Sequence, residues 1–326
     1  MPSVPPSYNY HAPAQTDLAP TRARQRSLHR RRPLSRRQFL RRLTRVGAGL
    51  LLASVYPFAE AKYCRILRQE IAVPRLPASF DGLRVVFMAD THHGPCVPLV
   101  YLRRAMAQAN ALRPDLILLG GDYVQQYPYP WLPQPGEYVE DAIRLFGALR
   151  APLGVFAVLG NHDNKSGLRA RIQTLLAQQG VRELTNTGVW LRRSEDNAPP
   201  EQSRLRLCGV DDLTTSVPNL PAALADATAQ DAAILLTHNP DYVEEELRDP
   251  RVSLVLCGHT HGGQVVVPFY GPPIVPSIFG QKYAHGLVQG PAGNTVFVTR
   301  GVGTILPPVR FLCPPEIALL TLRRAA

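Results

Sequence analysis

The sequence predicts an α/β fold, because short apolar stretches alternate along the chain with segments of helical periodicity. The apolar stretch 83–89 indicates a buried strand, and segment 98–112, which opens with Pro98, carries apolar residues at helical spacing. Five of the predicted strands end directly at Asp, Asn or His residues. Functional sites in open α/β sheets lie at the carboxyl ends of the strands, so this pattern predicts a site at that edge.

The remaining elements continue the same alternation. Further strands are expected at 115–119, 154–159, 205–208, 233–237, 253–257, 265–267, 295–299 and 317–322. Further helices are expected at 138–149 and 167–179. Loops are expected at the Pro-rich stretches 127–135 and 268–277.

The composition is that of a globular protein without a disulfide framework. The 326 residues are 45% hydrophobic, enough apolar material for one large α/β domain or two small ones. The five cysteines form no C-x-x-C pair, and an odd number leaves at least one thiol free or paired between chains. Cys208 and Cys257 end apolar stretches, which predicts that they are small buried hydrophobic residues.

The positive charge is concentrated at the N-terminus. The whole chain has a net charge of +11, and residues 1–61 contain 11 basic and only 2 acidic residues. The remaining residues, 62–326, hold 25 basic and 23 acidic residues. Because the body is nearly neutral, we expect no nucleic-acid-binding face.

The N-terminal segment has the order of a secretory signal. Residues 1–33 are polar and Pro-rich and are expected to be disordered, whereas Ser35-Arg36-Arg37-Gln38-Phe39-Leu40-Arg41 leads into an apolar stretch, 46–55, and then Ala59-Glu60-Ala61. The paired arginines resemble a bacterial twin-arginine signal. We therefore expect a disordered basic N-terminus and signal peptide over 1–61, a catalytic domain over 62–326, and export to the periplasm or cell envelope. The alternatives are a basic amphipathic or nucleic-acid-binding arm and a membrane anchor, although the apolar stretch is about half of the ~20 residues that a spanning helix needs.

The residues at the strand ends form a set of oxygen and imidazole donors without a thiolate. They are Asp90, His92, Asp122, Asn161, His162, His238, His259 and His261. Such donors suit Mn, Fe, Zn or Co. Asp90-Thr91-His92 and His259-Thr260-His261 each place two donors on one side of an extended segment, so two cations could be held between them.

The charge of this set favours hydrolysis of a phosphate ester or anhydride. Asp90 and Asp122 supply two negative charges against the four positive charges of two divalent cations. The excess attracts a hydroxide held between the cations and a phosphate oxygen. A lone His or a lone Gly-Asp is more often structural, but five such segments, each closing an apolar strand, argue for a common site.

In this order the segments resemble the calcineurin-like metallophosphoesterase superfamily, whose motifs are D-x-H, G-D, G-N-H-[DE], a lone His and G-H-x-H. Here they are Asp90-Thr91-His92, Gly121-Asp122, Gly160-Asn161-His162-Asp163, His238 and Gly258-His259-Thr260-His261. The flanking segments, among them Thr237-His238-Asn239-Pro240-Asp241 and Cys313-Pro314-Pro315-Glu316, are similar to an exported bacterial phosphodiesterase branch that carries twin-arginine signals.

The resemblance implies a four-layer α/β/β/α sandwich of two mixed sheets flanked by helices, with two divalent metals (Mn²⁺, Fe²⁺/³⁺ or Zn²⁺) at one edge. It implies that Asp90, His92 and His261 bind the first metal, that Asn161, His238 and His259 bind the second, and that Asp122 bridges both. It assigns to His162 a catalytic role beside the substrate, stabilising charge or protonating the leaving oxygen.

One position departs from a branch of the superfamily. Protein Ser/Thr phosphatases have an Asp three residues after the bridging Asp, where it orients the catalytic His, and this chain has Gln125. We therefore do not expect protein phosphatase activity. Asp163, next to His162, is either the orienting group or a structural residue.

The segment after His261 bears on the substrate. Residues 265–279 are Pro-rich and apolar, and they form either a loop packed on the sheets or an apolar wall beside the site. The second alternative suits a phospholipid-like diester or a lipid-linked anhydride such as UDP-diacylglucosamine, with peripheral membrane contact. His93, Tyr123, Asn164 and Arg300 lie beside the motifs, where either substrate contact or a structural role is compatible with the sequence.

The preferred function is a metal-dependent phosphodiesterase or pyrophosphatase. One alternative is a non-catalytic metal-binding envelope protein that uses the same fold as a scaffold. Another is a membrane-tethered factor that acts through its basic arm. The complete donor set opposes the first alternative, and the nearly neutral body opposes the second.

Overall fold

The computed structural model describes residues 35–126, 131–193 and 203–325, so the disorder predicted for 1–33 lies outside the described residues. The chain divides into two units, Met1–Gly49 and Leu50–Ala326.

Helix α1 (Arg36–Glu60) contains most of the described part of the first unit. It begins with a capping box, in which the Gln38 N–H donates to Ser35 Oγ at 3.2 Å and the Ser35 N–H donates to the Gln38 side-chain oxygen at 3.1 Å. Within the described ranges, no helix has both the length and the apolar character needed to cross a membrane.

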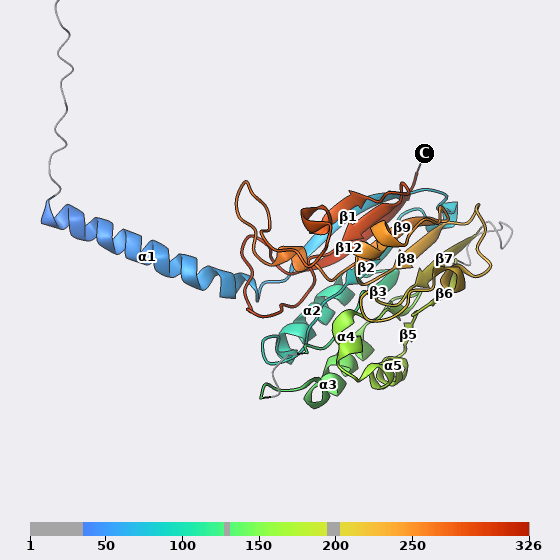
Figure 1. Ribbon diagram of the computed structural model, residues 1–326, viewed down its shortest axis with the longest axis horizontal. Coiled ribbons are helices and arrows are strands. Elements are labelled where there is room, and N and C mark those ends of the chain that lie inside the picture. Colours follow the sequence, from blue (N-terminus) through green and yellow to red (C-terminus); the bar gives the residue numbers. More distant parts are fainter. Residues whose placement is uncertain (1–34, 127–130, 194–202, 326) are drawn as a thin grey trace, which may run out of the picture. The chain divides into compact units, whose positions relative to one another are not determined.

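The second unit contains two six-stranded mixed sheets (Figure 1). The order in the first sheet is β1 (Arg65–Val73), β12 (Glu316–Arg324), β2 (Leu83–Met88), β3 (Leu116–Leu119), β4 (Val155–Ala157) and β5 (Val181–Glu183). Strand β12 runs antiparallel to β2, and the other neighbours are parallel. The carboxyl ends of β2, β3 and β4 therefore share one edge.

The second sheet has the same mixed character. Its order is β10 (Gly286–Gln289), β11 (Thr295–Val298), β9 (Val252–Cys257), β8 (Ala233–Leu236), β7 (Arg204–Gly209) and β6 (Thr187–Arg192). Its two outer pairs, β10 with β11 and β6 with β7, are antiparallel, whereas the central strands are parallel.

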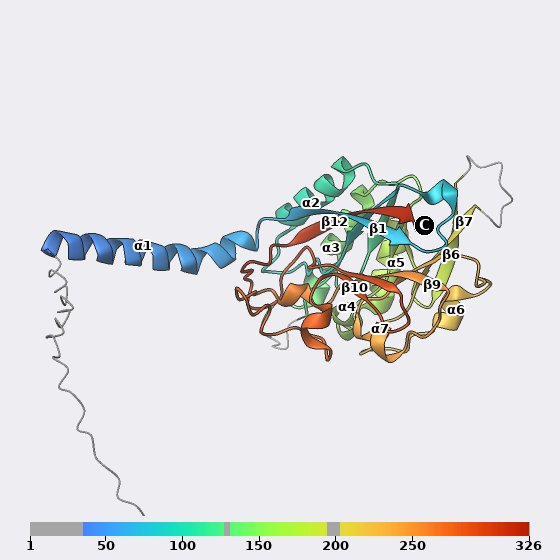
Figure 2. The ribbon, with the colours of Figure 1, turned by 90° about the horizontal axis from the view of Figure 1, so that it is seen from above.

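Helices cover the outer face of each sheet, which gives the predicted four-layer α/β/β/α sandwich (Figures 1 and 2). Those on the first sheet are α2 (Leu99–Ala111), α3 (Val139–Arg144) and α5 (Arg169–Gln178), and those on the second are α6 (Leu220–Leu224) and α7 (Asp241–Glu245). Alternate side chains of a strand enter different layers, so Phe87 packs between the sheets while Val86 packs under the helices. The long apolar stretches seen in the sequence are strands buried on both faces.

Short helical elements complete the unit. They are α4 (Asn161–Lys165) and the 3₁₀ turns Ala78–Phe80, Pro135–Glu137, Leu145–Ala148, His261–Gly263 and Gly280–Tyr283. The last turn of α1 is bonded to the loop before β12: the Arg310 N–H donates to the Pro57 carbonyl at 2.9 Å, and the Leu312 N–H donates to the Glu60 carboxylate at 2.8 Å.

Two predicted elements are corrected. Residues 265–267 do not form a strand, because Val265 and Val267 make only isolated bridges, and Pro268 together with the positive φ of Phe269 ends the extended backbone. The helix predicted at 138–149 ends at Arg144 and continues as a 3₁₀ turn. Each of the five cysteines carries a free thiol, and Cys208 and Cys257 are buried as predicted.

Candidate metal centre

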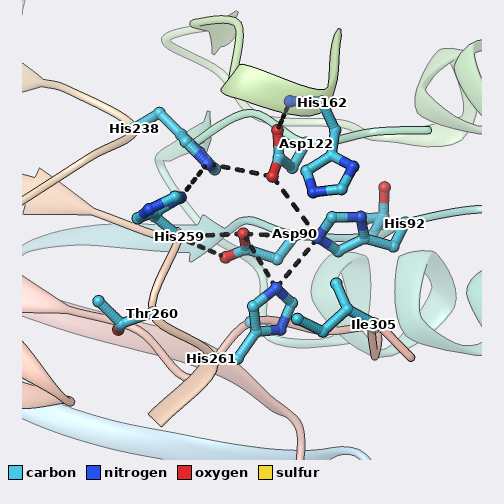
Figure 3. Close-up of polar contacts among 12 residues, drawn as sticks. Asp90, His92, Asp122, His162, His238, His259, Thr260, His261 and Ile305 are labelled. Atoms are coloured by element: carbon cyan, nitrogen blue, oxygen red, sulfur yellow. Dashed lines mark hydrogen bonds and ion pairs between the residues drawn. The ribbon is translucent and has the colours of Figure 1, made fainter. Parts of the chain in front are cut away.

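The predicted site residues meet at one edge of the sandwich, where the carboxyl ends of strands from both sheets face each other (Figure 3). Asp90, Asp122 and Asn161 follow β2, β3 and β4 of the first sheet, and His238 and His259 follow β8 and β9 of the second. Three overlapping groups of His and Asp have ligand atoms within 4.8 Å of one another. Residues separated by up to 171 positions in the sequence thus form one cluster.

The first donor set consists of Asp90, His92 and His261. The Nε2 atoms of His92 and His261 lie 3.0 Å apart, and Asp90 Oδ1 lies 3.6 Å from His261 Nε2 and 3.9 Å from His92 Nε2. Atoms that share an ion at bonds of about 2.0–2.2 Å lie roughly 3 Å or slightly more from one another. The spacing of this set therefore fits a divalent cation.

The second donor set consists of Asn161, His238 and His259. His238 Nε2 lies 3.1 Å from Asn161 Oδ1 and 3.3 Å from His259 Nδ1. Two imidazole nitrogens and an amide oxygen converge here in a buried place, a combination that suits a borderline divalent metal ion.

Asp122 lies between the two donor sets. Its Oδ2 is 3.6 Å from His92 Nε2 and 3.2 Å from His238 Nε2. Its other oxygen, Oδ1, accepts the backbone N–H of His162 at 2.8 Å. Since one carboxylate oxygen faces both sets, it is placed to bridge two ions, and the buried donors fit the pair of cations that the sequence predicts.

Five of the seven predicted ligands have a left-handed backbone. The φ angles are 56° at Asp90, 43° at His92, 55° at Asp122, 73° at His259 and 53° at His261. Non-glycine residues rarely adopt this region, and it costs roughly 1–3 kcal/mol for each residue. Strain concentrated on one cluster is typical of a functional site.

Glycines in the motifs allow the close approach of the strand ends. A Cβ on Gly160 would overlap the Asp122 carboxylate, and a Cβ on Gly258 would lie 2.7 Å from Asp90 Oδ2. The glycines in the G-N-H-D and G-H-T-H segments are therefore required because any side chain would overlap the two carboxylates, and not because a turn needs them.

Burial keeps most of the imidazoles neutral, which is the form that binds a metal. It lowers the pKa of His92 and of His261 well below the usual value. Burial, followed by the charge of His238, lowers the pKa of His259 to about 4.

His238 and Asp122 form the exception. Burial opposes protonation of His238, but the Asp122 carboxylate outweighs it and raises the pKa of His238 to about 10. Burial alone would raise the pKa of Asp122, yet the charges of His238 and His162 hold it well below its usual range. A cation bound between the donor sets would instead favour the neutral form of His238, since a ligating imidazole is deprotonated.

The outer contacts of the ligands differ between the two donor sets. His238 Nδ1 lies 2.8 Å from the Gly120 carbonyl oxygen, an arrangement that orients a metal-ligating His. His261 Nδ1 instead faces the Arg310 guanidinium at 3.3 Å, and His92 Nδ1 has no hydrogen-bond partner among the residues that the structure describes. Arg310 was not predicted from the sequence, since a single Arg in a loop carries no spacing signal.

His162 belongs to neither of the two predicted donor sets, but it forms the remaining group of close ligand atoms together with His92 and Asp122. Its ring is 4.8 Å from that of His92, edge to face, and the Gln126 backbone N–H donates to its Nδ1 at 3.5 Å. The Gln125 amide turns away and donates to the Gln126 carbonyl oxygen at 2.7 Å. The backbone N–H of Gln126 therefore makes the contact that orients the His162 ring, and the sequence did not identify this partner.

Asp163 has a structural role in the loop after β3. Its carboxylate accepts the N–H groups of Asp122, Tyr123 and Gly160 at 2.8, 2.9 and 3.0 Å. Burial, followed by the negative charge of Asp122, raises the pKa of Asp163 to about 7. Asp163 thus fixes the backbone that presents Asp122, and it makes no described contact with the His162 ring.

The residues beside the motifs make structural contacts. The Tyr123 hydroxyl donates to the Val158 carbonyl at 2.6 Å, and His93 Nδ1 lies 2.8 Å from the Val97 carbonyl oxygen. Asn164 donates to Thr215 Oγ1 at 2.9 Å, and Arg300 contacts His285.

Comparisons with known proteins agree with this geometry. The family described as calcineurin-like phosphoesterase matches residues 83–263. An uncharacterized metallophosphoesterase of Bacillus subtilis (strain 168), YkuE, is 32% identical over 89% of this chain and 98% of its own length. The phosphodiesterase YaeI of Escherichia coli (strain K12) is 32% identical over 89% of this chain and 99% of its own. The UDP-2,3-diacylglucosamine pyrophosphatase LpxG of Chlamydia trachomatis is 25% identical over 85% of this chain and 95% of its own. The chain belongs to the calcineurin-like phosphoesterase family and is a phosphoesterase hydrolase.

Proposed function

We propose that the protein is a two-metal phosphodiesterase or pyrophosphatase that acts on a lipid-linked substrate. The observation that carries the proposal is the position of Asp122, whose Oδ2 faces His92 at 3.6 Å and His238 at 3.2 Å. A carboxylate shared by two donor sets would hold two cations at one site, where both could act on the same phosphoryl group. When bound, such a pair of cations supplies an activated water and neutralises phosphoryl charge.

The donor residues make the site electrostatically selective for anions. Asp90 and Asp122 carry the negative charge of the cluster, and Asn161 contributes none. Two divalent cations therefore leave an excess of positive charge that a phosphate diester or anhydride neutralises. Mn, Fe and Zn all suit these nitrogen and oxygen donors, and manganese is our first choice for reconstitution.

His162 is the proposed proton donor. Because its Nδ1 accepts the Gln126 N–H, Nε2 carries the proton whenever the ring is neutral. The neutral ring can then donate a hydrogen bond from Nε2 to a phosphoryl oxygen, whereas protonation of the leaving oxygen starts from the imidazolium and leaves the neutral ring.

Two observations support a lipid-linked substrate. Phe269, Tyr270, Ile274 and Ile278, in the loop after His261, are exposed instead of packing on the sheets. The relative LpxG is named as a pyrophosphatase of UDP-2,3-diacylglucosamine, a diacylated substrate. An acyl-bearing phosphoester would match an apolar surface beside a phosphoesterase site.

The proposed place of action is the periplasm or cell envelope, reached through the twin-arginine pathway. The support is the sequence from Ser35 to Ala61, in which Arg36 and Arg37 precede an apolar stretch. Fusion of residues 1–61 to a reporter that is exported only when folded, with Arg36 and Arg37 replaced by Lys, tests this assignment.

The catalytic proposal is tested by hydrolysis of bis-p-nitrophenyl phosphate. Chelator-treated protein should be inactive, Mn²⁺ should restore turnover, and Asp122→Ala should abolish it. Asp81→Ala, a change at a half-exposed carboxylate, serves as the matched control and should leave turnover unchanged. Wild-type protein that binds two Mn²⁺ ions and cleaves neither diesters nor pyrophosphates would support the alternative of a non-catalytic scaffold.

A comparison of short-chain and long-chain phosphodiesters then tests the lipid-linked substrate. That assignment fails if the enzyme hydrolyses both at equal rates.

A further inference from the structure

Two loops of the second sheet, one between β9 and β10 and one after β11, are joined beside the metal centre. The Gln264 side-chain oxygen accepts the Ile305 N–H at 2.9 Å, and its amide donates to the Pro307 carbonyl at 3.3 Å. The Phe311 N–H donates to the Gln264 carbonyl at 2.9 Å. Loops 264–279 and 303–312, orange and red in Figures 1 and 2, therefore form one surface.

This surface carries an unusual number of exposed apolar side chains. Phe269 is fully exposed at 111%, and Ile274 and Ile278 are exposed at 77% and 75%. We call the apolar residues of the two loops that are at least 45% exposed the apolar rim, and its members are Phe269, Tyr270, Ile274, Ile278, Leu306 and Leu312. Val267 and Phe279, in the same loop, are less exposed at 41% and 37%. Apolar side chains scattered singly over a surface need no explanation, but six on two joined loops indicate a contact surface.

The backbone of the longer loop is held so that these side chains stay outside. The Gln281 amide donates to the Tyr270 and Pro272 carbonyls, each at 3.1 Å. The Asp241 carboxylate accepts the Ile278 N–H at 3.0 Å and also the Ser277 hydroxyl. These bonds anchor the main chain at Tyr270, Pro272 and Ile278 in the conformation that leaves the apolar side chains exposed.

The charges around the apolar rim are paired or buried. Residues 250–315 contain neither Asp nor Glu, but Lys282 pairs with Glu244 and Arg300 lies 3.9 Å from Glu316. The carboxylates that touch the two loops, Asp241 and Glu60, are buried in hydrogen bonds to the loop backbone. A surface with exposed apolar groups and paired charges suits the apolar boundary of a lipid bilayer, whatever the charge of its headgroups.

The apolar rim also adjoins the metal centre. Gly263 is two residues from His261, and a Cβ on it would lie 2.6 Å from the Ile274 carbonyl oxygen. Ile305, next to Leu306, lies beside the His261 ring in Figure 3. A bilayer that covers the rim would thus bring phosphoester headgroups to the site without extraction of the lipid.

We propose that the apolar rim is a membrane-docking face that inserts into a lipid bilayer and presents the metal centre to lipid headgroups. This inference rests on the proposed lipid-linked substrate and adds the surface that delivers it. A bilayer fits better than a protein partner, because a protein would need pockets for side chains as prominent as Phe269, whereas a lipid surface accepts them without complementary shape. Tyr270 adds the amphipathic aromatic group that is enriched at membrane interfaces.

The test is vesicle co-sedimentation of the full-length, Mn²⁺-loaded chain. Vesicles of phosphatidylcholine with about a quarter phosphatidylglycerol are compared with pure phosphatidylcholine. The rim variant combines Phe269→Ser, Ile274→Ser and Ile278→Ser. The matched control combines Val100→Ser, Val217→Ser and Leu287→Ser, three changes at exposed apolar positions elsewhere on the body.

We expect the rim variant to lose roughly tenfold or more of its partition onto both kinds of vesicle and the control to keep it. Turnover of bis-p-nitrophenyl phosphate should stay within about twofold in both, so failure of catalysis is recorded separately from failure of docking. The Phe269→Trp variant should show a blue shift of its emission on vesicle addition that the wild type does not show. Equal binding by wild type and rim variant, absence of wild-type binding, or an emission of the Phe269→Trp variant that does not shift each overturns the proposal. A concentration-dependent dimer lost in the rim variant, without vesicle binding, assigns the face to a second copy of the chain instead.

Discussion

The Arg310 guanidinium points at Nδ1 of His261 from 3.3 Å, so a fully buried cation stands behind a predicted metal ligand. The same guanidinium donates to the backbone carbonyls of His261 at 2.7 Å and Arg300 at 2.8 Å. Arg310 thus joins the loop that carries His261 to the segments that follow β11. The first donor set depends on this side chain for its shape, although no atom of Arg310 belongs to the set.

Replacement of Arg310 by Met should weaken both the fold and the first donor set. Several buried carbonyl groups would lose their donor, which we expect to lower the free energy of unfolding by about 3 kcal/mol. Manganese content, measured by mass spectrometry after reconstitution, should fall from two ions toward one for each chain. Retention of two ions with unchanged urea denaturation would show that Arg310 does not organise the site.

Asp163→Asn should damage the site through the backbone of Asp122. Each carboxylate oxygen now accepts main-chain N–H groups, and an amide would turn a donor toward some of them. We expect a loss of about 2–3 kcal/mol in the free energy of unfolding, measured in urea. Asp226→Asn, at an exposed carboxylate that accepts the Trp190 indole N–H, is the control and should change little.

His162→Ala should separate catalysis from metal binding. Loss of a positioned proton donor typically reduces turnover by about 10²–10⁴-fold. Because His162 completes neither donor set, the two Mn²⁺ ions should remain, as measured by mass spectrometry, whereas Asp122→Asn should lose them. A His162→Ala protein that loses an ion would make His162 a ligand and remove its proposed role.

Gly160→Ala should abolish metal binding without changing any donor. The φ of Gly160 is −103°, which alanine tolerates, so the effect comes from the overlap of the new methyl group with the Asp122 carboxylate. Gly136→Ala is the matched control, because nothing lies within 4 Å of the added methyl group. Full Mn²⁺ content in Gly160→Ala, measured beside that control, would contradict this steric account.

The sequence predicted the donor cluster better than the path of the chain around it. The donors follow apolar strands, and the carboxyl ends of such strands meet at one edge of a sheet. The sequence therefore predicted that Asp90, Asp122 and His238 lie close together. The division of those strands between two sheets came only from the family resemblance, since apolar runs do not show which strands pair. Strand β1 was missed because its exposed positions interrupt the apolar pattern.

Other features depend on tertiary contacts that leave no local pattern. Arg310 is isolated in the sequence, and only the folded loop places its guanidinium against His261. The orienting contact to His162 comes from a backbone amide, which any residue at position 126 other than proline would supply. The exposure of Phe269 and Ile274 depends on how Gln281 and Asp241 anchor their loop, and the sequence left both alternatives open.

Each donor set draws ligands from both halves of the sandwich. The first combines Asp90 and His92, which follow β2, with His261, which follows β9, and the second combines Asn161 with His238 and His259 in the same way. Bound ions would therefore act as cross-links between the two layers, closing long loops of the chain and removing much of the freedom of the unfolded state. The metal supply of the cell compartment would then govern the lifetime of the protein as well as its turnover, because chelation would release the layers from each other at the edge where they meet.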